Sequence, residues 1–163
     1  MVESRSSGRH VIELNEPDIR ELYVVRRALE RVAVRLAARN ACRRNRDALS
    51  RCLQELRQAV ADQDRSRVIA ADVETHWSIW RQAENKHLFH MLNSMIGPIF
   101  MFVAHNIDAA NWGETLAQHE AMVVAVQAGD EAAAIRGLDR HMDHALEHSI
   151  RSFRASQAND RDA

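Results

Sequence analysis

Apolar residues recur along most of the chain at intervals of three and four, the spacing that lines up side chains on one face of an α-helix. The first series begins with Leu22, Val25 and Leu29, and Pro17 precedes it where a first-turn proline belongs. Residues that cap or end helices divide the pattern into six segments. It predicts helices over about 17–40, from a cap at Asn45 to near 62–64, from a cap at Ser66 through Trp80, from Asn85 through Val103, over 115–128, and over 132–154.

Short links and two interruptions define how these helices are joined. Gly97-Pro98 interrupts the fourth segment, and we expect a kink or break near Ile96 because proline removes a backbone donor and clashes with the preceding turn. Gly129 is expected to end the fifth helix. Links of a few residues favour antiparallel neighbours. The sequence therefore predicts an all-α fold, an antiparallel bundle of about six helices.

The composition agrees with one helical domain. The chain has 163 residues, of which 46% are hydrophobic, and this length suits a single compact core. Only 5 glycines, 2 prolines and 5% aromatic residues are present, so turn residues and β-formers are scarce. Residues 1–16 lack a helical period and are expected to form a tail or connector. The helical domain is expected over 17–156, and a disordered tail over 157–163.

Charge and cysteine content narrow the class further. A formal net charge of −1 gives no support for general polyanion binding. Residues 20–57 are rich in arginine, which fits either a face for an anionic partner or ordinary solvated helix faces with ion pairs. No apolar run reaches the roughly 18 residues of a membrane span, no signal peptide is evident, and two cysteines cannot make a disulfide framework. We expect a cytoplasmic protein with no membrane partner.

Nine histidines supply the most distinctive chemistry of the chain. Asp72 and His76 are four residues apart, so their side chains leave the same face of one helix. His119 and His141 each stand among apolar residues on the inner faces of the fifth and sixth helices. Three imidazoles and one carboxylate suit a single divalent ion such as Zn, Ni, Co, Mn or Fe. The alternative is four separate polar side chains that form hydrogen bonds within the core.

Arg26 lies on the apolar seam of the first helix instead of its polar face. A buried guanidinium needs an anion, which is either Glu30 one turn later or the carboxylate of a ligand. His144 and His148 are expected on a solvated polar sector of the sixth helix. The sequence has no Gly-rich phosphate loop, no serine elbow of the hydrolase type and no Cys-x-x-Cys, and so offers no candidate for nucleophilic catalysis.

Several segments together resemble the FadR C-terminal (FCD) effector-binding domain of GntR-superfamily transcription regulators. They are ELYVVRRALE at 21–30, LAAR at 36–39, Asp72-x-x-x-His76, LAQHEAMVVAVQAGDEAAA at 116–134 and LDRHMDH at 138–144. The resemblance covers about residues 18–154. It implies an all-helical, usually dimeric domain that senses a small organic acid and moves an attached winged helix-turn-helix.

The resemblance also implies the residues of a site. The family's metal ligands match Asp72, His76, His119 and His141. The arginine that faces the ligand cavity from the first helix matches Arg26. The metal would be one divalent ion per chain, Zn, Ni or Mn, and an effector carboxylate would complete its shell. The family's arginines on the fourth helix have no counterpart here, which leaves His105 and Asn106 as neutral ligand-binding contacts.

Two further departures from the family are visible. Thr75 stands where the family often has Phe immediately before the third-helix histidine, which would alter the packing behind the site. Residues 8–16, GRHVIELNE, resemble the end of the wing and the connector after it, so most of the N-terminal winged helix-turn-helix is missing from this sequence. DNA binding is therefore expected only through that missing domain.

The sequence thus predicts a ligand-sensing regulatory domain and not an enzyme. A small carboxylate effector would bind at the metal and at Arg26, and a homodimer would control DNA binding. One alternative is a metal-dependent hydrolase or lyase, because an open histidine-rich site can activate water. It lacks a general base, since Glu74 and Glu120 are expected to point elsewhere. The other alternative is a helical dimer in which the metal serves stability alone.

Overall fold

The computed structural model describes residues 15–41, 47–95 and 111–159, and every regular element within these ranges is helical. The helices are α1 (Glu16–Asn40), α2 (Asp47–Ala61), α3 (Arg65–Gln82), α5 (Trp112–Ala128) and α6 (Glu131–Asn159), and residues 86–95 form a further helical segment. Over the described ranges, the all-α fold of six helical segments that the sequence predicts is confirmed.

Some helix boundaries differ from the predicted ones by a few residues. α5 begins at Trp112, three residues before the predicted start, and α6 continues to Asn159, five residues beyond the predicted end. Terminal turns depend on few hydrogen bonds, so a periodic pattern defines them poorly. The predicted kink at Gly97-Pro98 and the predicted cap at Asn45 lie outside the described residues.

α1 begins where the pattern predicts, and its own side chains define that position. Asn15 Oδ1 accepts a hydrogen bond from the backbone N–H of Asp18 at 2.9 Å, and Asp18 Oδ2 accepts one from the N–H of Asn15 at 3.0 Å. This reciprocal capping box occupies two donors that the first turn would otherwise leave open. Pro17 lies in the same turn, where its missing N–H costs nothing.

α3 begins two residues earlier than expected, because Asp64 caps it and Ser66 does not. Asp64 Oδ1 accepts a hydrogen bond from the N–H of Arg67 at 3.1 Å, and its backbone is extended, as a capping residue requires. The preceding Gln63 has a φ of 54°, which turns the chain out of α2. A carboxylate also interacts with the positive end of the helix dipole, which a hydroxyl cannot do as well. The prediction of a Ser66 cap is therefore wrong.

The turn between α5 and α6 follows the sequence signals closely. Gly129 has a φ of 76°, in the left-handed region where glycine is favoured, and its N–H donates to the carbonyl of Val126 at 3.1 Å. The N–H of Asp130 donates to the carbonyl of Ala125 at 3.0 Å. The Asp130 carboxylate then accepts a hydrogen bond from the N–H of Ala133 at 2.8 Å. One residue thus ends α5, and the next begins α6.

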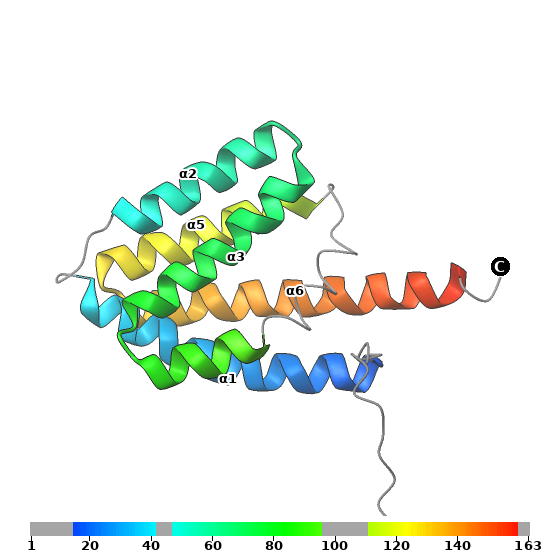
Figure 1. Ribbon diagram of the computed structural model, residues 1–163, viewed down its shortest axis with the longest axis horizontal. Coiled ribbons are helices and arrows are strands. Elements are labelled where there is room, and N and C mark those ends of the chain that lie inside the picture. The colour runs from blue at the N-terminus through cyan, green and yellow to red at the C-terminus, as the bar shows by residue number, and fades with distance from the viewer. Residues whose placement is uncertain (1–14, 42–46, 96–110, 160–163) are drawn as a thin grey trace, which may run out of the picture.

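α1 and α6 lie side by side and run in opposite directions (Figure 1). Cross-helix ion pairs join them at Arg39 and Glu131 (2.6 Å), Arg31 and Asp139 (3.6 Å), Arg27 and Asp143, and Glu16 and Arg154 (2.9 Å). The residue numbers rise on one helix as they fall on the other, which is the register of antiparallel neighbours. These pairs favour the interpretation of the α1 arginines as solvated, ion-paired residues over that of an anion-binding face.

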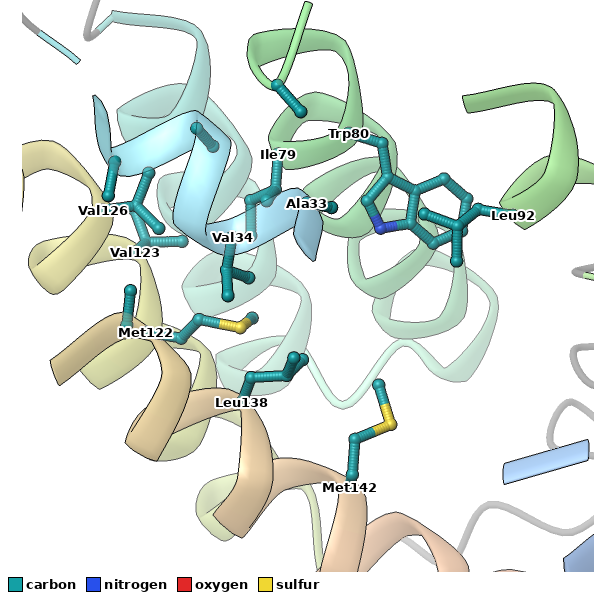
Figure 2. Packing of buried hydrophobic residues seen from close by; sticks show 14 of the residues in the cluster. Ala33, Val34, Ile79, Trp80, Leu92, Met122, Val123, Val126, Leu138 and Met142 are labelled. Atoms are coloured by element: carbon teal, nitrogen blue, oxygen red, sulfur yellow. The ribbon is translucent and has the colours of Figure 1, made fainter. Parts of the chain in front are cut away.

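The core fills the space between these two helices and the layer formed by α2, α3 and α5 (Figure 2). The side chains that fill it include those of Val34, Ile79, Trp80, Leu92, Met122, Val126, Leu138 and Met142, all at most 1% exposed. Gly137 of α6 lies against α5, since a Cβ added to it would be 3.1 Å from the Cα of Met122. The two helices therefore approach more closely than side chains normally allow.

A substitution at Leu138 tests how much this core contributes to the free energy of unfolding. We expect Leu138→Ala to lower the free energy of unfolding by about 2–5 kcal/mol, because it leaves a cavity among closely packed helices. Val124→Ala on α5 is the matched control, since Val124 is 58% exposed and its removal should change stability by less than about 0.5 kcal/mol. Urea unfolding followed by circular dichroism measures both. Equal midpoints for the two variants would contradict the described core.

Candidate metal centre

Three histidines from three different helices meet in the interior. His76 of α3, His119 of α5 and His141 of α6 are 0%, 0% and 5% exposed. One nitrogen from each lies within 4.8 Å of the others. Their rings are inclined to one another, with centroids 5.2 Å apart for His76 and His119 and 4.5 Å apart for His119 and His141. The inward direction that the sequence predicts for these three residues agrees with their placement.

Hydrogen bonds on the outer nitrogens fix the orientation of two of these rings. Nδ1 of His119 donates to the backbone carbonyl of Thr115 at 2.8 Å, one turn earlier on α5. Nδ1 of His76 donates to Oε2 of Glu30 at 2.8 Å. A neutral imidazole that donates from Nδ1 carries its lone pair on Nε2. Both Nε2 atoms therefore carry the lone pair on the inner side of the cluster, and that of His76 also lies 3.2 Å from Nε2 of His141 and 3.4 Å from Nη2 of Arg26, contacts with which an ion would compete.

The distances between inner atoms match those of ligands that share one ion. Nε2 of His76 is 3.2 Å from Nε2 of His141, and Nε2 of His119 is 3.1 Å from Oδ1 of Asp72. Ligands held about 2.0–2.1 Å from a zinc-sized ion lie about 2.9–3.4 Å apart at angles between square and tetrahedral. Asp72 lies beside the three histidines through its contact with His119. Asp72 is not part of the group of three histidines whose ligand atoms lie within 4.8 Å of one another, so the structure brings three of the four predicted ligands together and places the fourth beside His119.

Two buried atoms of the cluster have no hydrogen bond to any described residue. They are Nε2 of His119, whose contact with Asp72 lacks hydrogen-bond geometry, and Nδ1 of His141. Leaving a buried polar atom unpaired costs roughly 1–3 kcal/mol. Nε2 of His119 points at the other imidazoles, and a cation among them would satisfy it. The donor set and this orphaned atom both fit a divalent transition metal.

Burial favours the neutral form of His119 and His141, which is the form that binds metal. It lowers the pKa of His119 below 6.5, an effect that the negative charge of Asp72 opposes in part. It lowers the pKa of His141 further, and positive charge on His119, His76 and Arg26 acts in the same direction. Protons therefore compete weakly for these two nitrogens.

Arg26 and Glu30 of α1 form a buried ion pair behind His76, with Nε of Arg26 2.6 Å from Oε1 of Glu30. Burial raises the pKa of Glu30, but the charges and hydrogen bonds of His76 and Arg26 outweigh it and lower that pKa to about 2. Arg26 also lies 3.4 Å from Nε2 of His76 through Nη2. Of the two anions considered for Arg26, Glu30 is the one found beside it.

A cavity of about 50 Å³ adjoins the cluster, and Arg26, Asp72 and His141 form part of its wall. His144 and His148 of α6 line it as well, so the expectation that they lie on a solvated sector is wrong. They follow His141 by three and seven residues, which puts all three on one face of the helix. That spacing was the sequence signal that could have placed them. Nε2 of His144 pairs with Oε2 of Glu114 at 3.4 Å.

Residues 21–144 match the family model described as FCD domain. The chain belongs to the FCD domain family. Among curated proteins, this FCD chain is 28% identical over 154 residues to the probable D-xylose utilization operon transcriptional repressor of Paenarthrobacter nicotinovorans. That match covers 94% of this chain and 64% of the relative, so the chain spans less than two thirds of the relative's length.

Two solved structures share the fold of this FCD domain. McbR/YncC of E. coli matches with a TM-score of 0.81 at 21% identity, over 92% of this chain and 73% of that one. The metal-free FCD domain of TM0439 matches with a TM-score of 0.75 at 16% identity, over 88% of this chain and 99% of that one. Family and curated relative are those of transcription regulators and not of enzymes, which supports a regulatory role.

His105 and Asn106 lie outside the described residues. A groove of about 470 Å³ between α2 and α3 is lined by Arg51, Cys52 and Ser78 among others, with none of the histidine ligands. Within the described ranges, no helix is both long enough and apolar enough to cross a membrane.

We predict about one divalent transition metal per chain, measured by elemental analysis of protein purified without a histidine tag or chelator. His119→Ala removes a central ligand and should abolish this binding. In the wild type, metal at about a hundred times its Kd should stabilise the fold by about 2.7 kcal/mol.

His90→Ala is the matched control. It makes the same chemical change at an exposed position away from the cluster. It should keep the full metal content. Full metal occupancy in the His119→Ala variant would refute the assignment of this ligand.

Proposed function

We propose that this chain is the ligand-sensing domain of a GntR/FadR-type transcription regulator, which binds a small carboxylic acid at a metal centre. The observation that carries the proposal is the convergence of three buried imidazoles, each with one nitrogen within 4.8 Å of the others and with Nε2 of His76 3.2 Å from Nε2 of His141. Asp72, His76, His119 and His141 would hold one Zn, Ni or Mn ion. When bound, the metal supplies a Lewis-acidic position for the oxygen of an acid.

The residues of this chain then define what kind of molecule the cavity accepts. Arg26 contributes a fixed positive charge to the wall, and the hydroxyl of Tyr23 lies in the same wall, 2.9 Å from Oγ of Ser149. Burial raises the pKa of Tyr23, so this hydroxyl stays protonated and donates to the backbone carbonyl of Ala145 at 3.3 Å. The wall also holds the carboxylate of Asp72, so it is the guanidinium of Arg26 that we propose as the partner of a small anionic molecule. This supports a carboxylate effector.

α1 gives the site a route to the rest of a regulator. Arg26 and Glu30 lie in the middle of this helix, and their contact with His76 joins it to the cluster. Effector binding would favour the helix arrangement to which it binds more tightly, typically by about 1–3 kcal/mol. Control of DNA would require an N-terminal DNA-binding domain beyond the residues of this sequence. We propose a cytoplasmic homodimer, and the exposed Val24 and Val25 of α1 offer apolar surface to a second copy.

The carboxylates near the site do not favour a hydrolase or lyase. Glu74 pairs with Arg81 at 2.6 Å, and Glu120 pairs with Arg57 at 2.5 Å, both on exposed faces. Glu30 is already occupied by Arg26 and His76. Among the described residues, none of these three is available as a general base beside the cluster. The following test distinguishes a metal that only stabilises the fold from a metal that takes part in ligand sensing.

We expect small carboxylates to raise the melting temperature of metal-loaded protein and to leave metal-free protein unchanged, as measured by thermal shift. Arg26→Lys keeps the charge beside Glu30 but loses the planar fork that binds carboxylates, so it should reduce the carboxylate shift several-fold. Arg31→Lys is the control, since Arg31 is half exposed and pairs with Asp139.

A metal-dependent melting temperature that no carboxylate in the panel changes would support the structural role of the metal and overturn the sensor proposal. An unchanged carboxylate shift in Arg26→Lys would remove Arg26 from the effector site.

A further inference from the structure

Glu30 is a fully buried carboxylate with three hydrogen-bond donors around it. Nε of Arg26 lies 2.6 Å from Oε1, while Nδ1 of His76 and Nε1 of Trp80 lie 2.8 and 3.3 Å from Oε2. Glu30 and Trp80 are 0% and 1% exposed. Transfer of a charged pair from water to the interior is costly, and apolar residues of similar volume would often serve stability as well or better. The packing of α1 alone therefore does not explain why a carboxylate stands here.

We propose that Glu30 is a positioning residue of the metal centre, which holds His76 with its proton on Nδ1 and its lone pair on Nε2 toward the ion. The inference rests on the proposed metal centre and goes beyond its ligands. A carboxylate on the outer nitrogen fixes both the tautomer and the ring direction of a ligating histidine, and raises its basicity. The positive charge of Arg26 balances the negative charge of Glu30 and so stabilises the ionised form of this carboxylate.

The three imidazoles differ in what supports them. The outer nitrogen of His119 is bound by a neutral backbone carbonyl, and that of His141 has no hydrogen bond to a described residue. Among the described residues, His76 is thus the one ligand of the three with a carboxylate behind it. A change at Glu30 should therefore act on metal affinity through His76 and not through the cluster as a whole.

Glu30 also brings a fourth helix to the centre. The four candidate ligands come from α3, α5 and α6, whereas Glu30 belongs to α1. Its carboxylate reaches His76 and Trp80, which lie one turn apart on α3. The carboxylate thereby fixes α3 against α1 at the level of the ligand.

The test compares Glu30→Gln with Glu131→Gln for the affinity of Zn²⁺ or Ni²⁺, measured by competition with a fluorescent chelator. Both changes remove one negative charge from an ion pair between a glutamate and an α1 arginine, but Glu131 pairs with Arg39 at an exposed site. We expect Glu30→Gln to weaken metal binding about 10–100-fold and Glu131→Gln to leave it within twofold. Equal affinities for Glu30→Gln and the wild type would overturn the proposal.

A double-mutant cycle separates positioning from general stability. In a His76→Ala background, Glu30→Gln should have little further effect on metal affinity, because the histidine on which it acts is absent. The same 10–100-fold loss in both backgrounds would show that Glu30 acts on the fold and not through His76, and would refute the inference. The melting temperature of chelator-treated protein is measured alongside, since a purely structural role would move that value alone.

If Glu30→Gln fails to fold because Arg26 is left unpaired, Arg26→Gln combined with Glu30→Gln removes both buried charges and takes its place. Weaker metal binding in this folded double variant, with His76 unchanged, supports the proposal, and wild-type affinity rejects it. Failure of the wild-type protein to bind metal would instead refute the proposed metal centre itself.

Discussion

Six polar side chains meet where the four helices α1, α3, α5 and α6 exclude water, and each can stay there only while its hydrogen-bonding atoms are occupied. They are Arg26, Glu30, Asp72, His76, His119 and His141, none of them more than 8% exposed. Arg26 and Glu30 satisfy one another, and Glu30 and Thr115 satisfy two outer imidazole nitrogens. Within the cluster, Nε2 of His119 and Nδ1 of His141 are left without a hydrogen bond to a described residue. The proposed metal would satisfy the first of these two atoms.

Much of this arrangement is visible in the sequence, because helices bury one face and spacing identifies that face. The spacing of Asp72 and His76, and the apolar neighbours of His119 and His141, were enough, with a family resemblance, to predict that these side chains face the interior, where all four are buried. Spacing along the chain does not predict how α3, α5 and α6 are rotated about their axes relative to one another, and this rotation decides whether their histidines meet. That depends on packing between residues far apart in the chain, such as Met122 against Gly137.

The residues that sequence reasoning misjudged share one physical cause. His144 and His148 carry polar neighbours, yet the helix face they share with His141 continues along the cavity. Glu30 was considered only as a partner for Arg26, since its contact with His76 joins positions 46 residues apart, on different helices. A pattern of residues in the sequence describes one helix at a time, whereas the hydrogen bonds that hold a buried side chain in place often come from a neighbouring helix. The start of α3 was a simpler error. Asp64 and Ser66 are both residues that commonly cap helices, they stand two positions apart, and the cap is Asp64.

Gly137 has a consequence for the size of ion that the centre accepts. It lies one turn before His141 on α6, and Met122, which it touches, lies one turn after His119 on α5. The missing side chain therefore sets the distance between the two helices beside the two imidazoles, whose ring centroids are 4.5 Å apart. A larger residue there would widen the gap between the two imidazoles without touching either one. If the proposed centre holds a metal, its preference among ions of different radius would be set in part by a residue that has no side chain to bind them.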